Sequence, residues 1–259
     1  MTKALGWIVV SLLVFSTESL AQQPAAQTPE TAEAQYVALQ AGLFDEQTLT
    51  ASPEPVARIA RMLREIRSQF PAVESLRVPV QMTANTSVII GLQPVFRPKL
   101  NSLCTGWSGY SQARKPAIDI PEIDAVTGRF SGSYEVTCQG SGAALGSYVV
   151  VNFPRPLHVP SLSRLYGAAA GVTSAQNNKV VVGGVMPVSV KQEDGQWRVT
   201  FGMGAGDCPA GCTYREYHNF LVASDSTIQY LGHEQEGQML TPVLQRDPET
   251  TSPDQALPQ

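Results

Sequence analysis

The fold is decided by residues 188–201, which read Val-Ser-Val-Lys-Gln-Glu-Asp-Gly-Gln-Trp-Arg-Val-Thr-Phe. Apolar and polar residues alternate before and after the central Asp-Gly pair, and this dipeptide is typical of a tight hairpin turn. A second alternating segment covers residues 214–222, and a last strand is expected at 227–231. Together these segments predict an antiparallel β-meander over residues 179–245, with one face of the sheet covered.

Residues 206–212 interrupt the meander with the sequence Gly-Asp-Cys-Pro-Ala-Gly-Cys. Two cysteines at this spacing can form a small disulfide ring, a metal clip or a redox pair. Redox enzymes of the thioredoxin class use Cys-x-x-Cys at the start of a helix, where the helix dipole lowers a thiol pKa. The pair in this chain has three intervening residues and leads into a strand-like segment, so the spacing and the context argue against a redox pair.

The chain contains four cysteines, which are Cys104, Cys138, Cys208 and Cys212. In an exported protein four cysteines favour two disulfides, and three pairings are possible. Chain closure favours Cys104 with Cys138 and Cys208 with Cys212, because each pair lies within a local segment. In the chain-entropy treatment the larger ring contributes about 4 kcal/mol and the smaller one about 2 kcal/mol.

The N-terminus predicts export. Lys3 precedes an apolar run over residues 4–15, and small residues follow at 19–21. This pattern is typical of a secretory signal peptide over residues 1–21, and it is too short to span a bilayer comfortably. We therefore expect a periplasmic or extracellular protein with no stable membrane insertion after signal cleavage.

The net charge of −4 is unevenly distributed. Acidic residues concentrate in residues 22–50, which we interpret as a polar linker with a possible short helix, and in residues 246–259, which we interpret as a disordered tail. The segment between these two regions is close to neutral, so nothing in its charge indicates a nucleic-acid partner.

Residues 51–178 predict a helix followed by strands and a second helix. Ser52 and Pro53 are typical of a helix start. An apolar stripe at helical spacing follows them, formed by Val56, Ile59, Leu63, Ile66 and Phe70. Four arginines lie off this stripe and are expected on a solvated surface, namely Arg58, Arg61, Arg64 and Arg67.

Buried-type strands are expected at 87–92 and 147–153, and a helix from residue 160 leads into a strand at 172–175. Residues 103–141 are rich in Gly, Ser and Pro and predict an irregular insertion tied by Cys104 and Cys138. Within it, 134–138 is expected as a return strand, while Asp119, Glu122 and Asp124 are expected in a solvent-facing loop. The predicted fold class is therefore α+β.

Two stretches resemble a known family. Residues 88–92 (Val-Ile-Ile-Gly-Leu) and 162–178, with Leu-x-x-Leu-Tyr leading into Gly-Val-x-x-Ala-x-x-Asn, resemble the ferredoxin-like prodomains of subtilisin-type proteases. This resemblance implies a βαββαβ body that binds or inhibits a protease. The chain departs from the family because no serine-protease motif follows.

The Gly-Asp-Cys-Pro-x-Gly-Cys loop, taken with this body, resembles a group of exported bacterial proteins of unknown function. That group implies no activity. Its members usually carry Trp where this chain has His218, which implies that His218 faces the core.

Copper binding is one alternative use of the loop. Cys208, Cys212 and His218, with Met203 and Asp207 nearby, are residue types that copper accepts. The histidine lies far into a strand, however, and an exported cysteine pair is expected to be oxidised. We therefore expect no metal and no cofactor.

The leading functional interpretation is a non-catalytic binding or protease-inhibitor-like module with a protein partner. An unrecognised periplasmic or extracellular enzyme and a copper-binding protein are the alternatives. No catalytic residue is assigned. The candidate functional loop comprises Asp207, Arg215, Glu216 and His218, and the enzyme alternative requires these side chains, with His218 or His233, to meet in one pocket.

Overall fold

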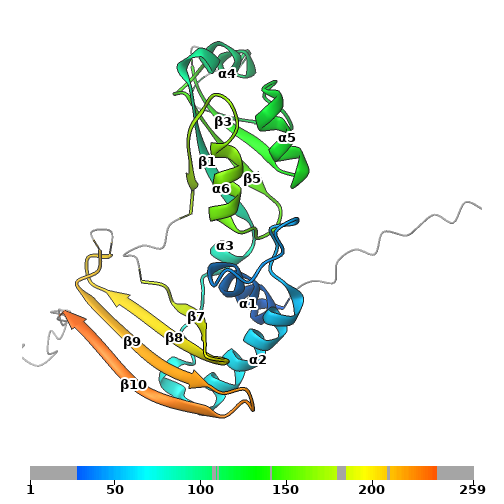
Figure 1. Cartoon of the computed structure of the whole chain (residues 1–259). Coiled ribbons are helices and arrows are strands. Elements are labelled where there is room, and N and C mark those ends of the chain that lie inside the picture. The colour runs from blue at the N-terminus through cyan, green and yellow to red at the C-terminus, as the bar shows by residue number, and fades with distance from the viewer. Residues whose placement is uncertain are drawn as a thin grey trace, which may run out of the picture.

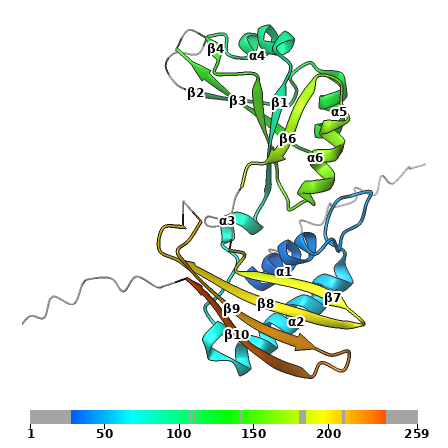
Figure 2. The ribbon, with the colours of Figure 1, turned by 60° about the vertical axis from the view of Figure 1, so that its left-hand side comes forward.

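The computed structural model describes residues 28–106, 109, 111–140, 142–179, 185–208 and 211–237. The predicted signal peptide and the C-terminal tail lie outside these residues. Two lobes are stacked on one another (Figures 1 and 2). The upper lobe comprises residues 86–177, and the lower lobe combines residues 29–83 with residues 185–237. Each lobe has its own hydrophobic core, and Phe44 and Leu49 of the N-terminal part of the chain pack into the upper one.

The upper lobe is built on an antiparallel sheet with the strand order β2-β3-β5-β1-β6, and a short β4 pairs with β3. Its strands are β1 (Thr86–Leu92), β2 (Ser111–Lys115), β3 (Ser133–Gln139), β4 (Ala143–Ala144), β5 (Tyr148–Phe153) and β6 (Val172–Asn177). Side chains alternate between the two faces of a strand, and the fully buried Val88, Ile90, Val149 and Val151 lie on one face.

The helices of the upper lobe are α4 (Arg97–Leu103), α5 (Pro121–Arg129) and α6 (Val159–Gly167), and the short helix η2 (Pro94–Phe96) precedes α4. Helices α5 and α6 lie against the same face of the sheet, as Figure 2 shows. Between them the Thr127 hydroxyl lies 2.6 Å from the Tyr134 hydroxyl and 2.8 Å from the Tyr166 hydroxyl. Burial raises the pKa of both tyrosines, so this core cluster is held neutral.

The lower lobe is the predicted meander covered by N-terminal helices. Its strands run in the order β10-β9-β8-β7 and are β7 (Val188–Glu193), β8 (Gln196–Ala205), β9 (Tyr214–Val222) and β10 (Ile228–Gly237). Its helices are α1 (Pro29–Gln40), α2 (Pro53–Gln69), η1 (Pro71–Val73) and α3 (Val80–Thr83). Asp194 and Gly195 both have positive φ, as the predicted Asp-Gly hairpin between β7 and β8 requires.

The α+β class, the antiparallel meander and both disulfides are confirmed. The location of the first predicted helix differs from the expectation. The sequence predicts that this helix belongs to one α+β body over residues 51–178, but α2 buries its apolar stripe in the core of the meander. The stripe predicts only that the helix covers an apolar surface, and both sheets offer one.

Residues 22–50 are predicted to be a polar linker with a possible short helix, and the structure has a helix there, α1, which belongs to the lower core rather than to a linker. Ala34 and Val37 are fully buried, and Glu33 is also buried because it pairs with Arg67. The expectation that Arg67 lies on a solvated surface is therefore wrong. Its guanidinium donates to both Glu33 carboxylate oxygens, at 2.8 and 2.9 Å.

The segment 103–141 is more regular than its composition predicts. It contains β2, α5 and β3, and β3 lies inside the sheet rather than in an excursion from it. Asp124 accepts hydrogen bonds from the backbone amides of Ile118 and Ile120, at 3.1 and 3.2 Å, and so fixes the start of α5. The last strand also extends beyond the prediction, to Gly237.

Candidate functional site

The predicted cysteine loop is a disulfide-closed turn between β8 and β9. Cys208 is bonded to Cys212, and their Cα atoms lie 3.6 Å apart. Within the ring, the Gly211 amide donates to the Cys208 carbonyl at 3.0 Å, and the Cys212 amide donates to the Asp207 carbonyl at 3.1 Å. Asp207 is exposed, and it holds the turn through this backbone carbonyl.

Two glycines of β8 make room for this loop. A Cβ atom on Gly204 would lie 2.5 Å from the Cys212 sulfur, and one on Gly202 would lie 2.6 Å from the Met186 carbonyl oxygen. Only glycine permits such close contacts without displacement. The Gly202-x-Gly204 pattern therefore lets Cys212 and Met186 pack directly onto one face of β8.

Arg215 lies on the same face as the ring, because it is the partner of Gly204 in the β8–β9 register. Its guanidinium donates to the Gly211 carbonyl at 2.6 Å and lies 3.5 Å from the Glu236 carboxylate. Arg215 therefore fastens the ring to the sheet.

Glu216 and His218 lie on the opposite face. His218 is the register partner of Phe201, which is fully buried beneath the helices. The His218 Nε2 atom lies 3.0 Å from the Glu216 carboxylate, and its Nδ1 atom lies 3.2 Å from the Tyr230 hydroxyl. Glu216 also accepts a hydrogen bond from Tyr214 at 2.8 Å, and this bond raises the pKa of the Tyr214 hydroxyl.

The sheet thus divides the candidate functional loop into two groups. Asp207 and Arg215 belong to the ring side, while Glu216 and His218 form a polar chain on the helix side. His233 joins the second group, with its ring centre 6.0 Å from that of His218. The single pocket that the enzyme alternative requires is not formed by these side chains.

The copper alternative finds no ligand set in the part of the chain that the structure describes. Both sulfurs of the loop are in the disulfide, and His218 is on the far face of the sheet. No group of three or more His, Cys, Asp or Glu side chains among the described residues could hold a metal ion.

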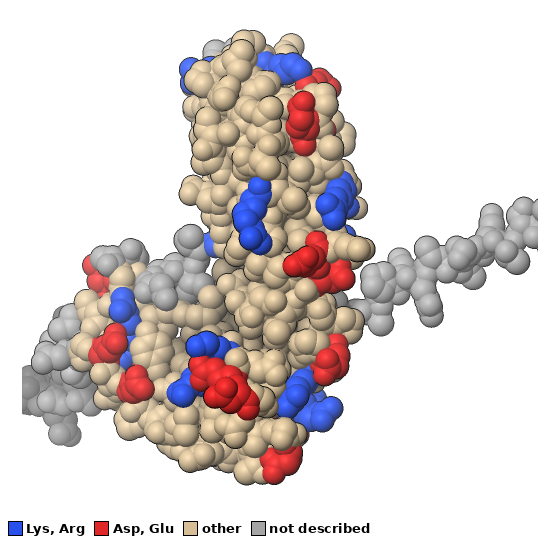
Figure 3. Space-filling view, viewed as in Figure 1, with Lys and Arg blue, Asp and Glu red and all other residues tan. Residues whose placement is uncertain are grey.

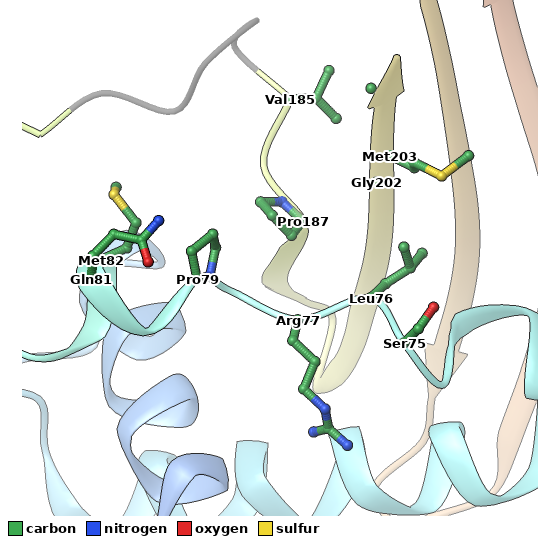
Figure 4. A pocket seen from close by; sticks show the side chains of 11 residues that line it. Ser75, Leu76, Arg77, Pro79, Gln81, Met82, Val185, Pro187, Gly202 and Met203 are labelled. Carbon is green, nitrogen blue, oxygen red and sulfur yellow. The ribbon is translucent and has the colours of Figure 1, made fainter. Parts of the chain in front are cut away.

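An apolar hollow of the lower lobe is shown in Figure 4 and lies beside the ring, because Gly204 belongs to its lining and contacts Cys212. It has a volume of about 360 Å³. Its lining residues are Ser75, Leu76, Arg77, Pro79, Gln81, Met82, Val185, Pro187, Gly202, Met203 and Gly204. We call this hollow the groove. One wall is the segment 75–82, and the other is the end of β8, so Gly204 links the groove directly to the cysteine ring.

The buried pair of Glu33 and Arg67 holds the first wall. Arg67 donates to the Leu76 carbonyl at 2.6 Å, and Glu33 accepts from the Val78 amide at 2.9 Å. A buried pair with this many hydrogen bonds has one well-defined geometry. The segment 75–82 is therefore fixed to α1 and α2.

The second wall presents the backbone edge of β8. Pairing with β7 runs as far as Val188 opposite Phe201, and the Gly202 amide then donates to the Pro187 carbonyl at 3.0 Å. Peptide groups two residues apart on a strand face the same side, so those of Gly204 face the same edge. Within the described ranges no strand pairs with β8 beyond that point on this side.

Charged side chains of both signs are mixed on the face shown in Figure 3. They form no continuous patch of one sign there. No described helix is long and apolar enough to cross a membrane. Comparison of the chain with protein-family models, with curated proteins and with solved structures gave no match.

Sequence reasoning singled out the ring and its glycines but missed the groove. Of the glycines at 202–206, Gly206 has the positive φ of a tight turn, while Gly204 lies within β8 and makes room for Cys212. The other wall comes from residues more than 100 positions earlier in the chain, and neither Leu76 nor Met82 carries a local signal of its role.

Proposed function

We propose that this protein is an exported, non-catalytic binding module, and that its partner is a protein segment bound in extended form in the groove. One observation carries this proposal, namely that an apolar hollow lies beside an edge of β8 that no described strand covers. An extended peptide that joins a sheet edge gains main-chain hydrogen bonds, while pockets beside the edge select its side chains.

The cysteine ring has a scaffolding role in this proposal. Cys212 packs onto Gly204, and Arg215 ties the ring to the neighbouring strand. The ring thereby holds the end of β8 in place beside the groove. A rigid edge lowers the entropic cost of binding a flexible segment.

We also propose that the upper lobe is a βαββαβ unit of the ferredoxin-like type. In such a unit the first and third strands are central, and both helices lie on one face. The path β1-α5-β3-β5-α6-β6, with the strand order β3-β5-β1-β6, supports this assignment. On this view β2, β4 and α4 are additions at one end of the unit. The two stretches that resemble protease prodomains both belong to the upper lobe.

The binding proposal is tested by selecting random peptides of about ten residues on the exported protein. We expect the selected peptides to alternate apolar and polar residues and to lose binding to a Met203→Asp variant. Leu231→Asp is the matched control, since Leu231 is an exposed apolar residue of the same sheet outside the groove. Equal loss in both variants, or selection of no peptide at all, refutes the proposal.

The inhibitor-like form of the proposal is tested separately with a subtilisin-type protease. The upper-lobe resemblance predicts that the intact protein slows hydrolysis of a small peptide substrate. Rapid cleavage of the protein without any inhibition refutes the proposal of an inhibitor-like function. The proposal that the groove binds an extended segment is unaffected by that result.

A further inference from the structure

The lining of the groove is mostly apolar but includes one positive charge. Among the residues that the structure describes, Arg77 is the one charged residue of the lining, and none of them brings a carboxylate to it. The remaining lining side chains are apolar or neutral. Whatever binds along this wall therefore meets a single positive charge at one point.

Glu33, the neighbour of Arg77, does not neutralise the Arg77 charge. Glu33 already accepts three short hydrogen bonds, two from Arg67 and one from the Val78 amide, at 2.8, 2.9 and 2.9 Å. Arg77 lies farther away, with 3.6 Å between its Nη1 atom and the Glu33 carboxylate. Since Arg67 already neutralises Glu33, the cluster of these three residues keeps a net charge of about +1.

Arg77 is also far less buried than the other two residues of this cluster. Its side chain is 46% exposed, whereas those of Glu33 and Arg67 are 4% and 5% exposed. In Figure 4 the Arg77 side chain points away from the segment 75–82 toward the helices. A long arginine side chain can swing to the rim of the groove at little cost, because its contact with Glu33 is long and half-exposed.

From this charge balance we infer that the groove selects apolar segments that carry a carboxylate, and that Arg77 is the residue that recognises it. The inference rests on the proposed function and adds the chemical class of the bound segment. An arginine guanidinium binds a carboxylate through two parallel hydrogen bonds. The Ser75 hydroxyl, in the same lining, offers a further donor. The carboxylate can be an acidic side chain or a free C-terminus, since the chemistry is the same.

The test uses one peptide selected on the groove, prepared in three forms. The first ends in a free carboxylate, the second has an amidated C-terminus and an internal Glu, and the third is amidated and contains no acid. We expect one or both acidic forms to bind the exported protein about tenfold more tightly than the neutral form. The form that gains affinity identifies the source of the carboxylate.

Three variants then identify the recognising residue. Arg77→Met should reduce the acidic forms to the affinity of the neutral form, and Arg77→Lys should restore part of the difference. Arg198→Met is the matched control, since Arg198 is 45% exposed and also lies 3.6 Å from a glutamate, but outside the groove. It should leave all three affinities unchanged.

The outcomes separate this inference from the proposed function. Equal binding of all three peptide forms overturns the inference and leaves the groove proposal intact. An equal effect of Arg198→Met also overturns it, because the preference would then reflect the overall charge of the protein. Absence of binding by any form removes both proposals. Thermal unfolding of each variant checks that none of these results reflects a loss of folding.

Discussion

The upper and lower lobes differ in how the chain is joined into a stable fold. The upper lobe is one continuous segment, residues 86–177, and its disulfide joins two fully buried cysteines, Cys104 and Cys138. The lower lobe combines two distant parts of the chain, which meet in one shared apolar core, and the buried pair of Glu33 and Arg67 joins α1 to α2 within the first of these parts. Its own disulfide spans only four positions. The difference indicates that the upper disulfide stabilises a fold, while the lower one shapes a local surface.

The largest effect is expected from breaking the ion pair of the lower lobe. Glu33→Ala leaves the Arg67 charge buried without its partner, so the free energy of unfolding should fall by about 3–5 kcal/mol. Trp197, buried in the lower core, reports the transition by fluorescence in urea. Replacing both partners, as Glu33→Leu with Arg67→Met, should recover most of the loss.

Glu30→Ala is the control for this prediction, because Glu30 is exposed in the first turn of the same helix. Its expected effect is below about 1 kcal/mol. If Glu33→Ala is no more destabilising than Glu30→Ala, the ion pair does not hold the lower lobe together.

Removal of the upper disulfide should lower the free energy of unfolding more than removal of the lower one. Their cysteines are 34 and 4 positions apart. Chain entropy then predicts a loss of about 4 kcal/mol when Cys104 and Cys138 are both replaced by Ala, and about 2 kcal/mol for Cys208 and Cys212. Urea unfolding of the two double variants measures both values. A larger loss from the small ring would reverse the comparison between the lobes.

A smaller effect is expected at the contact between the ring and β8. Gly204→Ala places a methyl group 2.5 Å from the Cys212 sulfur, and such overpacking costs about 1–3 kcal/mol. The cost should shrink when Cys208 and Cys212 are both Ala, because the sulfur is then absent. Gly128→Ala is the control, since a methyl group there meets no atom within 4 Å. An unchanged cost in the ring-free background would show that the ring does not press on Gly204.

The smallest effect concerns the contact between the lobes. His158 of the upper lobe stacks on Phe44, with 3.9 Å between ring centres, and Phe44 follows α1 in the chain. Burial, and then the charge of Arg164, lowers the pKa of His158 below its ordinary value of 6.5. The unfolded chain therefore binds the proton more readily, and stability falls as the pH drops below about 6.5.

His158→Asn should reduce this dependence on pH, because Asn does not titrate. The measurement is the free energy of unfolding at pH 7.5 and at pH 5, for the native protein and the variant. A native protein whose stability is the same at both values contradicts the assigned direction.

The sequence predicts those features of the fold that depend on neighbouring residues. The alternation around Asp194 and Gly195 located the hairpin, and closure of local segments favoured the observed disulfides. Helix α5 was missed because its segment is short and contains Gly128, although Pro121 at its start is a known helix signal.

Contacts between distant segments could not be predicted. The stripe of α2 fits either sheet, and nothing near Glu33 in the sequence indicates a partner 34 positions away. The candidate site was predicted in part for the same reason. The ring and its glycines are local, while the opposite wall of the groove is positioned only by packing on α1 and α2.

The most direct test of the binding proposal is a methyl spectrum of the protein labelled at its methionines and titrated with a peptide selected on the groove. Met82 and Met203 lie on opposite walls of the groove, and Met62 is buried in the lower core. We predict that the signals of Met82 and Met203 shift together at saturating peptide while that of Met62 stays in place. Binding that leaves the Met82 and Met203 signals unmoved would contradict the account, because the segment would then lie elsewhere on the protein.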